Sequence, residues 1–465
     1  MLTQTFRLGF ILLFLFQGIL SINAQETTSV VVKEFKIIGN KTTHESIIIR
    51  EIPVNVYDTI PAENLKDKLD WIKSNLLNTS LFNFVTVEPV YFDDQNISIF
   101  ITVEERWYWW PIPIFEIQET NFNTWWLDKN FNRVNYGMSV SKENFRGRKE
   151  RLSFLLQNGY TEKAGVKYSI PYINKKKTNG ISVMFSYSRN REISYDVSNN
   201  VRDFYRSNKE YVQKEIKSSV GYEFRPRLYN KHNFNFDYTD VSVADSVLNF
   251  NENYLINNND QMRYFSAKYS FKWDRRNVKN YPTVGSYLDF KLFKHGVGVL
   301  SDVNSFYLTS HYKKFWQLSN NLYFASSAKT KFTIQEAPYY LLNGFAFGND
   351  LVRGYELYVI NADNYGLTKF QLRYSLLKDK VFNVNAIRFE KFNKIPLNIY
   401  LGAYFDAGYA GLKNNEQKNS LSNTSLYGGG VSLDFVSYYD LVLRVEYSIN
   451  RMNEKGLFLH FIAPI

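Results

Sequence analysis

The chain has no cysteine among its 465 residues. This absence excludes disulfide bonds, zinc sites built on thiolates and catalytic thiol nucleophiles. Histidine is scarce, and its five occurrences are His44, His232, His295, His311 and His460. No two of them stand at the spacing of metal ligands on one helix, and we find no nucleophile elbow, phosphate-binding glycine loop or dinucleotide fingerprint. The sequence therefore predicts a protein that is not an enzyme, with no catalytic residue, no metal site and no cofactor.

Long hydrophobic runs are also rare, and the one clear apolar stretch lies at the N-terminus. Residues 8–20, LGFILLFLFQGIL, follow Arg7 and precede the short sequence SINA. A positive charge, a short apolar stretch and a small residue before a polar segment are typical of a secretory signal peptide. The stretch is short for a membrane span. We expect a signal peptide over residues 1–24, cleavage after Ala24, and an exported protein without a helical membrane span.

Aromatic residues and positive charge are plentiful. Phe, Tyr and Trp make up 17% of the chain, and these residues favour strands and membrane interfaces. The net charge is +11, which suits either nucleic acid or an anionic membrane surface. The basic residues form no dense run beyond residues 175–177. We therefore expect no nucleic-acid partner and read the charge as suited to a membrane.

Residues 29–106 predict a small domain of their own. A β-rich stretch over residues 30–38 ends at a Gly-Asn pair, Thr43 is a candidate helix cap, and a second helix begins at Pro61. Two strands follow over residues 82–92 and 96–105, the second with strict apolar alternation. The predicted order is β-α-α-β-β.

Beyond residue 107 the sequence consists of long segments in which apolar and polar residues alternate. In residues 263–274, RYFSAKYSFKWD, aromatic and apolar side chains share one face and polar side chains share the other. A soluble sandwich would also alternate, but the aromatic face, the segment length and the predicted export favour a membrane barrel. Such a sheet has to close, because hydrocarbon does not tolerate a free edge. Roughly 360 residues at about 22 per strand and connection give about 16 strands, an even number.

The sequence LVRGYELY, residues 351–358, stands out within a long connection over about residues 335–366. The connection carries apolar and aromatic residues, so we expect it to fold back into the barrel lumen. Arg353 would then be buried and would need a carboxylate partner. Alternation places Tyr404, Asp406 and Gly408 on the lumen face of LGAYFDAGY, and Asp434 on that of YGGGVSLDF. A simpler alternative is that Arg353 only solvates a surface loop.

Three stretches of the N-terminal domain, GNKTTHESIIIREI, SLFNFVTVEPV and FITVEER, occur in that order. Together they resemble a POTRA domain, the periplasmic module of the BamA/TamA outer-membrane assembly family. The resemblance implies that an exposed sheet edge in this domain binds extended client chains by strand addition.

The C-terminal part resembles the barrel of the same family. VRGY is similar to the arginine-bearing tip of the family's sixth extracellular loop, and YFDAG is similar to the strand motif against which that tip packs. The resemblance implies a loop-locking set of Arg353, Gly354 and Tyr355 with the wall partners Tyr404, Asp406, Gly408, Asp434 and Arg373. DRRNVKNYPTVGS is similar to the family's Asp-x-Arg…Pro-x-x-Gly hairpin, which implies a motif of Asp274, Arg275, Pro282 and Gly285.

The sequence departs from the family pattern in three places. Gln371-Leu372-Arg373 stands where Glu-x-Arg is common, the chain ends in FIAPI rather than in an aromatic residue, and only one POTRA-like unit is present. The first departure removes one candidate charge partner for Arg353 and shifts weight to Asp406. The second leaves the pairing of the last strand open.

We therefore predict a mostly β protein, a transmembrane antiparallel barrel over residues 107–465 with a small N-terminal α/β domain. The resemblance implies that it sits in the outer membrane with the N-terminal domain in the periplasm. It also implies insertion or translocation of outer-membrane proteins by strand templating at a lateral gate. The implied partners are outer-membrane lipid, unfolded outer-membrane protein clients, and periplasmic chaperones or lipoproteins. A passive channel, a dedicated secretion pore and lipid transport across the envelope remain the alternatives.

Overall fold

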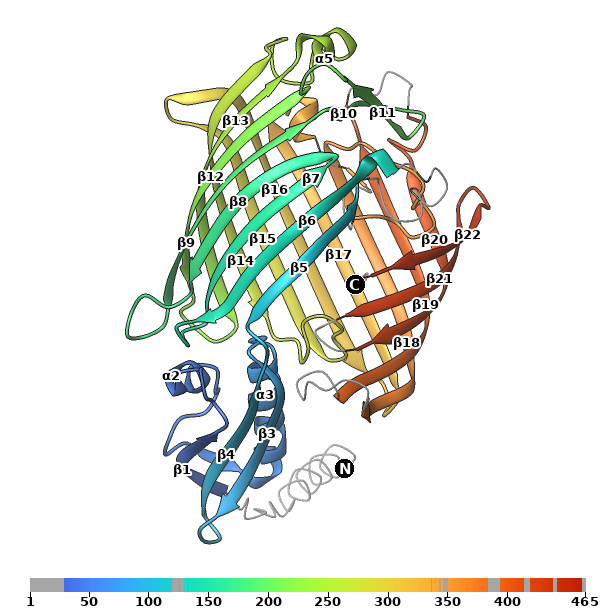
Figure 1. Cartoon of the computed structure of the whole chain (residues 1–465). Coiled ribbons are helices and arrows are strands. Elements are labelled where there is room, and N and C mark those ends of the chain that lie inside the picture. Colours follow the sequence, from blue (N-terminus) through green and yellow to red (C-terminus); the bar gives the residue numbers. More distant parts are fainter. Residues whose placement is uncertain are drawn as a thin grey trace, which may run out of the picture.

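The computed structural model places a small N-terminal domain against one end of a large curved sheet (Figure 1). It describes residues 29–118, 125, 129, 131–335, 337–342, 344–345, 350–383, 394–413, 419–437 and 441–461. The predicted signal peptide over residues 1–24 lies outside these ranges. Within them, every helix is too short or too polar to cross a membrane. We call the barrel end beside the N-terminal domain the proximal rim and the other end the distal rim.

The N-terminal domain packs two helices on a sheet with the strand order β2-β1-β4-β3. Ile97, Ile99 and Ile101 alternate along β4 and are fully buried, as are Ile72 and Leu76 of α3. The predicted β-α-α-β-β order is found, with one further short strand, β2. The elements are β1(Ser29–Ile38), α2(Glu45–Ile49), β2(Thr59–Pro61), α3(Ala62–Leu77), β3(Phe82–Tyr91) and β4(Asn96–Glu105).

The start of α2 differs from the prediction. His44 occupies the cap position without a side-chain hydrogen bond. Thr43 instead donates its hydroxyl to the Glu105 carboxylate at 2.6 Å, and its backbone N–H donates to the same oxygen at 2.7 Å. A buried carboxylate is a stronger acceptor than a neutral group, so Thr43 fixes the end of β4 rather than capping the helix.

The rest of the chain forms a sheet of 16 strands in which consecutive barrel strands pair antiparallel, which confirms the predicted fold. Between β9 and β12 the chain makes a separate hairpin of β10(Glu192–Ser198) and β11(Val201–Arg206). A short helix, α5(Asp245–Phe250), lies at the distal rim (Figure 1). The barrel strands are β5(Trp109–Ile117), β6(Val134–Phe145), β7(Glu150–Gly159), β8(Thr161–Ile170), β9(Asn179–Asn190), β12(Gln213–Phe224), β13(Asn230–Val243), β14(Gln261–Asp274), β15(Gly285–Val297), β16(Leu300–Gln317), β17(Leu322–Gln335), β18(Asn364–Asn383), β19(Lys394–Gly411), β20(Ser425–Val436), β21(Val442–Asn450) and β22(Lys455–His460).

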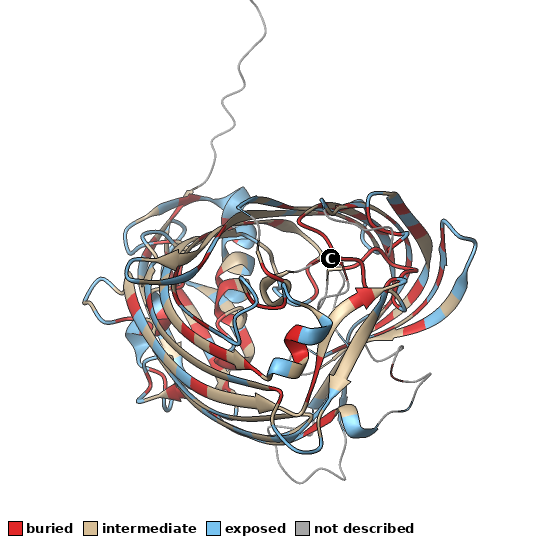
Figure 2. Ribbon diagram, turned by 90° about the horizontal axis from the view of Figure 1, so that it is seen from above, coloured by how far each residue is buried: buried red, intermediate tan, exposed pale blue. Residues whose placement is uncertain are grey.

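The outer face of the barrel is apolar and aromatic. Phe234, Phe236, Phe332, Phe370 and Phe405 are all large side chains left exposed on their strands. Polar residues alternate with them and face inward, because successive side chains of a strand point to opposite faces. A view from the distal side shows the strands enclosing a lumen, with buried segments inside the ring (Figure 2). A soluble protein has the opposite distribution of apolar and polar side chains. An apolar outer face is what a barrel surrounded by lipid requires.

Strand pairing stops at one place in the sheet. The order runs from β22 to β5 without a break, and no pairing joins β5 to β22 among the described residues. β5 has nine residues and β22 has six, and each is paired on one side only, with β6 and β21 respectively. We call this break between the first and last barrel strands the seam.

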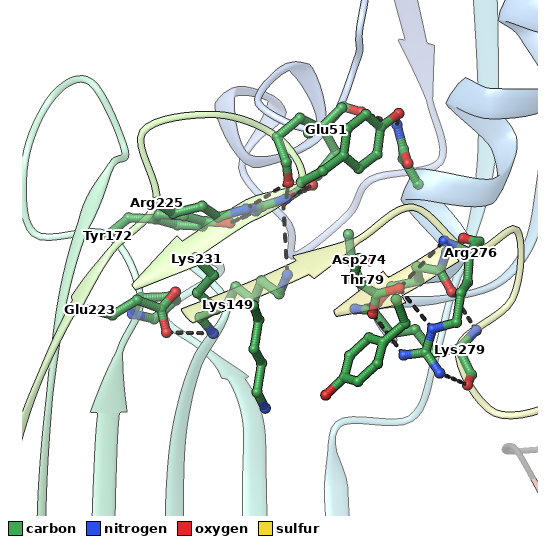
Figure 3. Close-up of a pocket in the computed structure, with 17 residues that line it drawn as sticks. Glu51, Thr79, Lys149, Tyr172, Glu223, Arg225, Lys231, Asp274, Arg276 and Lys279 are labelled. Carbon is green, nitrogen blue, oxygen red and sulfur yellow. Dashed lines mark hydrogen bonds and ion pairs between the residues drawn. The ribbon is translucent and has the colours of Figure 1, made fainter. Parts of the chain in front are cut away.

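The N-terminal domain contacts the proximal rim through residues on either side of α2 and through α3 and its C-terminal end. The backbone N–H of His44 donates to the Gly147 carbonyl at 3.0 Å. Arg225 donates to both carboxylate oxygens of Glu51, at 2.6 and 2.7 Å (Figure 3). Burial alone raises the pKa of the Glu51 carboxyl, but the Arg225 guanidinium and Lys149 beside it hold that pKa well below its usual range. Glu51 therefore stays ionised and holds the two parts together at neutral and mildly acidic pH.

Candidate functional site

The long connection between β17 and β18 folds into the barrel near the distal rim. A backbone bridge joins Phe345 to Ile360 and closes the connection on itself. Both side chains are buried with Val352 and Tyr355, in one apolar cluster with wall residues of β18, β19 and β20. The apolar residues of this connection thus gain burial that they would lack in a solvated loop.

Arg353 lies at the centre of this inserted loop and binds Asp406 on β19. Its Nε and one Nη donate to the two carboxylate oxygens at 2.8 and 2.5 Å, and its backbone N–H donates at 3.1 Å. The guanidinium also lies over the Tyr404 ring, 3.8 Å from the ring centre. Both charged side chains are almost fully buried, and Lys369, the cross-strand neighbour of Asp406, approaches it to 3.8 Å. A bidentate pair of this kind fixes orientation as well as charge.

Glycine permits this close approach of loop and wall. Gly354 has a φ of +97°, a conformation that other residues rarely adopt. On β20, a Cβ at Gly428 would lie 2.0 Å from the Arg353 carbonyl oxygen, and on β19 a Cβ at Gly408 would lie 2.8 Å from Val352. Tyr355 is buried beside them, with its hydroxyl 3.4 Å from the Tyr427 carbonyl.

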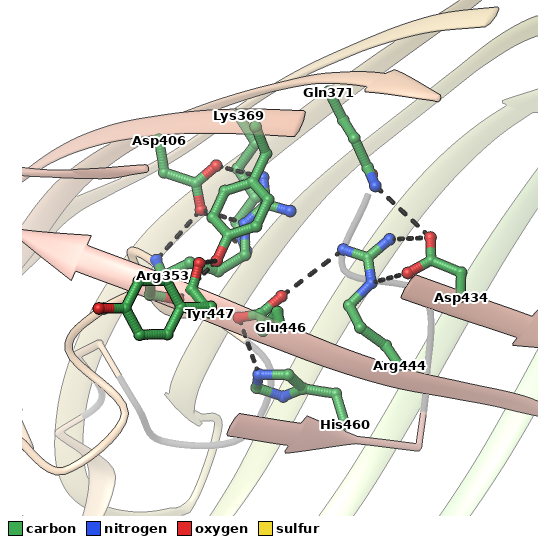
Figure 4. A network of polar contacts seen from close by, with 12 residues as sticks. Arg353, Lys369, Gln371, Asp406, Asp434, Arg444, Glu446, Tyr447 and His460 are labelled. Atoms are coloured by element: carbon green, nitrogen blue, oxygen red, sulfur yellow. Dashed lines mark hydrogen bonds and ion pairs between the residues drawn. The ribbon is translucent and has the colours of Figure 1, made fainter. Parts of the chain in front are cut away.

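Asp434 does not contact Arg353. It accepts two hydrogen bonds from Arg444, at 2.7 and 2.5 Å, and one from the Tyr281 hydroxyl at 2.5 Å. Gln371, which stands where the family commonly has Glu, lies 3.5 Å from the same carboxylate. The predicted wall partners therefore fall into two groups, one at Arg353 and one around Asp434 nearer the proximal rim (Figure 4).

Arg373 belongs with the predicted hairpin motif. Its Nη1 donates to the Pro282 carbonyl at 2.9 Å, and its guanidinium lies 4.5 Å from the centre of the Tyr281 ring. Gly285 has a φ of +114°, and a Cβ there would lie 2.1 Å from the Arg275 carbonyl. The turn between β14 and β15 thus connects the lumen wall to the proximal rim.

The two arginines of this turn have different surroundings. Asp274 accepts two hydrogen bonds from Arg276, each at 2.7 Å. The Arg275 guanidinium lies over Trp71 of the N-terminal domain, at 5.2 Å, and near Tyr229. The Asp-x-Arg spacing points to Arg276, whereas the predicted set contains Arg275.

Two buried carboxylates, Glu356 and Glu446, and the partly buried His460 form a cluster near the seam that sequence reasoning did not bring together. His460 on β22 places its Nε2 3.1 Å from Glu446 on β21 and 3.7 Å from Glu356 on the inserted loop (Figure 4). Glu446 lies 3.8 Å from Arg444, which continues the network to Asp434. Strand alternation places Glu446 and His460 inward, but no periodic signal places Glu356. These contacts connect the last strand to the loop.

A 16-stranded barrel with an inward-folded arginine loop and an N-terminal α/β module defines the class of outer-membrane barrels that carry POTRA domains. Residues 144–449 match the Omp85 superfamily domain, and residues 30–106 match POTRA, described as a surface antigen variable number repeat. The chain belongs to the Omp85 superfamily. Membership supports a location in the bacterial outer membrane and a broad role in insertion or translocation there.

Solved structures show the same fold at low sequence identity. BamA from Haemophilus ducreyi lacking POTRA domains 1–3 is 15% identical, with a TM-score of 0.53 over 92% of this chain and 83% of that one. CdiB from Escherichia coli is 9% identical, with a TM-score of 0.53 over 93% of this chain and 75% of that one. No curated protein sequence matches the chain.

Proposed function

We propose that this protein inserts or translocates outer-membrane proteins by offering the strand edges at the seam to client strands. The observation that carries the proposal is that no pairing joins β5 to β22 among the described residues. Each edge strand presents backbone N–H and C=O groups that an extended client segment can pair with. The reaction needs no catalytic residue, cofactor or metal, because pairing and burial of the client supply the free energy.

The composition of β5 supports a seam that opens readily. Pro111 and Pro113 lie in β5 and remain in register with Val140 and Met138 of β6. Proline is tolerated in a strand where its nitrogen faces away from a hydrogen-bonded neighbour. The free edge of β5 therefore lacks two N–H donors, and a complete ladder with β22 cannot form.

The inserted loop holds the barrel wall beside the seam in a fixed position. Arg353 binds Asp406 on β19, and His460 of β22 contacts both Glu446 and Glu356. In this proposal the loop-locking set keeps β18 to β21 in place while β22 exchanges partners. Asp434 and Arg373 extend the same bracing toward the proximal rim.

The assignment of regions follows from this function. Residues 1–24 are the signal peptide, residues 29–106 the periplasmic domain, and residues 107–465 the outer-membrane barrel with its inserted loop at about 335–366. β3 is an edge strand of the N-terminal sheet and is paired on one side, with β4. We propose that it holds extended clients before transfer, alone or with periplasmic chaperones or lipoproteins.

Cross-linking across the seam tests the proposal without background, because the chain has no cysteine. Phe115→Cys on β5 and Leu457→Cys on β22, both exposed on the outer face, provide a pair for a bismaleimide reagent, and each single variant treated with the reagent is a control. Purified protein in liposomes is mixed with an unfolded client barrel, and client folding is followed by heat-modifiable migration on gels. We expect the bridged double variant to lose client folding while both singles keep it. Full activity in the bridged protein would contradict a gate at the seam.

A further inference from the structure

A cavity of about 380 Å³ lies between the N-terminal domain and the proximal rim of the barrel (Figure 3). The N-terminal domain lines it with one carboxylate, Glu51, and with the polar groups of Asn75, Asn78 and Thr79. All of the cationic residues that line it come from the barrel. The two domains therefore line the cavity with residues of opposite net charge.

A second cavity, of about 390 Å³, adjoins the first from inside the barrel. Both are lined by Pro171, Glu223, Lys231 and Lys272, so they lie side by side, and we call the two together the joined cavities. The second adds lysines from three strands, together with serine and asparagine side chains. A few hundred cubic ångströms with convergent polar groups is the size of a small-molecule site.

The joined cavities carry a large excess of positive charge. Among the described residues, three carboxylates line them, and each already binds a cation: Glu51 binds Arg225, Glu223 binds Lys231, and Asp274 binds Arg276. Nine cationic residues line the same space, namely Lys149, Lys167, Arg225, Lys231, Lys268, Lys272, Arg276, Lys279 and Lys291.

Several of these lysines form no ion pair with the carboxylates that line the cavities, although Asp289 lies directly opposite Lys272 in the strand register. Lys291 binds Asp289 outside the cavities, and Lys279 donates to the Asn78 carbonyl. No hydrogen bond or ion pair joins Lys167, Lys268 or Lys272 to another described residue, although Lys268 lies over the Phe293 ring at 5.0 Å. Confined like charges repel one another, and an anion among them removes that repulsion.

We propose that these joined cavities bind a phosphate-bearing anion. A compact, multiply charged oxyanion suits several ammonium groups that act as point charges, with the neighbouring side chains of Ser169, Ser182 and Asn235 as further polar contacts. The anion is either a soluble phosphate compound or the headgroup of an anionic phospholipid.

Calorimetric titration of the full chain in detergent with tripolyphosphate tests the proposal. The variant is Lys268→Met with Lys272→Met, which removes two charges from the cavities. The control is Lys66→Met with Lys73→Met, which removes two charges from the exposed face of α3. We expect one saturable site in the native protein and the control, and affinity at least about tenfold weaker in the variant, because charged hydrogen bonds of this kind are lost. Heat-modifiable migration verifies that both variants are folded, and Lys167→Met serves as a second variant if the first is not.

Two further titrations identify the source of the anion. Dihexanoyl phosphatidic acid carries a free phosphate headgroup, whereas dihexanoyl phosphatidylcholine has its phosphate neutralised by choline. Binding of phosphatidic acid with the same dependence on Lys268 and Lys272 assigns a lipid headgroup, and binding of tripolyphosphate alone assigns a soluble phosphate compound. The proposal is wrong if neither anion binds saturably, or if the α3 control weakens binding as much as the cavity variant. Client folding is not the readout, so the result is independent of the proposed function.

Discussion

The pair of Arg353 and Asp406 is costly to bury and more costly to break. Both side chains are at most 1% exposed, and each would be an uncompensated buried charge without the other. Removing one partner of such a pair costs about 3–5 kcal/mol, whereas replacing both costs much less. The pair therefore selects one position for the loop, rather than adding stability in proportion to its contacts.

Substitution of Arg353 by lysine is predicted to lower barrel stability even though the charge is kept. A lysine cannot donate two parallel hydrogen bonds to Asp406 or stack on Tyr404 in the same way. We expect a lower temperature for the heat-modifiable transition in Arg353→Lys and a larger loss in Arg353→Ala. In a double-mutant cycle with Asp406→Asn the two losses should be strongly non-additive. Additive losses would show that the two side chains act independently.

Gly428→Ala is predicted to displace the inserted loop without changing any charge. The new Cβ would lie 2.0 Å from the Arg353 carbonyl oxygen, which is backbone and cannot move alone. We expect increased protease cleavage within residues 337–363 and reduced client folding. Gly366→Ala is the matched control, because a Cβ there meets nothing within 4 Å. Equal protease resistance in both variants would refute the close approach.

Sequence alone predicts which residues of the barrel wall face the lumen, but it predicts the contacts of the loop residues less well. Alternation in LGAYFDAGY places Tyr404 and Asp406 inward, and the same reasoning applies to Asp434. It does not tell which cation reaches which carboxylate, since that depends on the height of the loop in the lumen. Asp434 instead binds Arg444, its direct cross-strand neighbour on β21, and Glu356 carries no periodic signal at all.

The first barrel strand, β5, lacks two backbone hydrogen-bond donors at its free edge. Pro111→Val with Pro113→Val restores two N–H donors on β5, each able to contribute about 0.5–1.5 kcal/mol to pairing. We predict that the seam closes more firmly and that client folding slows roughly tenfold, while the unfolding temperature rises. Client folding in liposomes measures the rate, and Pro396→Val on β19, away from the seam, is the control. Unchanged or faster folding in the β5 variant would mean that pairing at the seam does not limit the reaction.

The long strands were predictable and the short elements were not. Segments such as residues 263–274 alternate over enough residues to identify β14. β2 has three residues, and β10 and β11 have seven and six, so each is too short for a clear pattern within polar surroundings. β10 and β11 pair with each other across a two-residue turn, whereas β2 pairs with β1 near the start of the domain.

Controlled depletion of the protein in its host, followed by quantitative proteomics of the outer membrane, tests the function of the intact molecule. We predict that many unrelated barrel proteins fall together, because backbone pairing at the seam does not read side chains. A fall confined to one or a few proteins would identify a dedicated translocator. No fall in any barrel protein would contradict the proposed function and favour a channel or lipid transport.

The two halves of the barrel are held together by different means. On the β18–β21 side, buried ion pairs such as Arg353–Asp406 and Arg444–Asp434 join the loop and neighbouring strands. On the β6–β9 side, the ion pairs Arg146–Glu150, Arg151–Glu143 and Arg189–Glu162 have arginine side chains that are 52%, 54% and 38% exposed, so these pairs add less. One half is consequently stiff and the other compliant. If the seam widens as we propose, we expect the change in curvature to fall on β5 to β9 and thinning of the adjacent bilayer to concentrate along that side of the barrel.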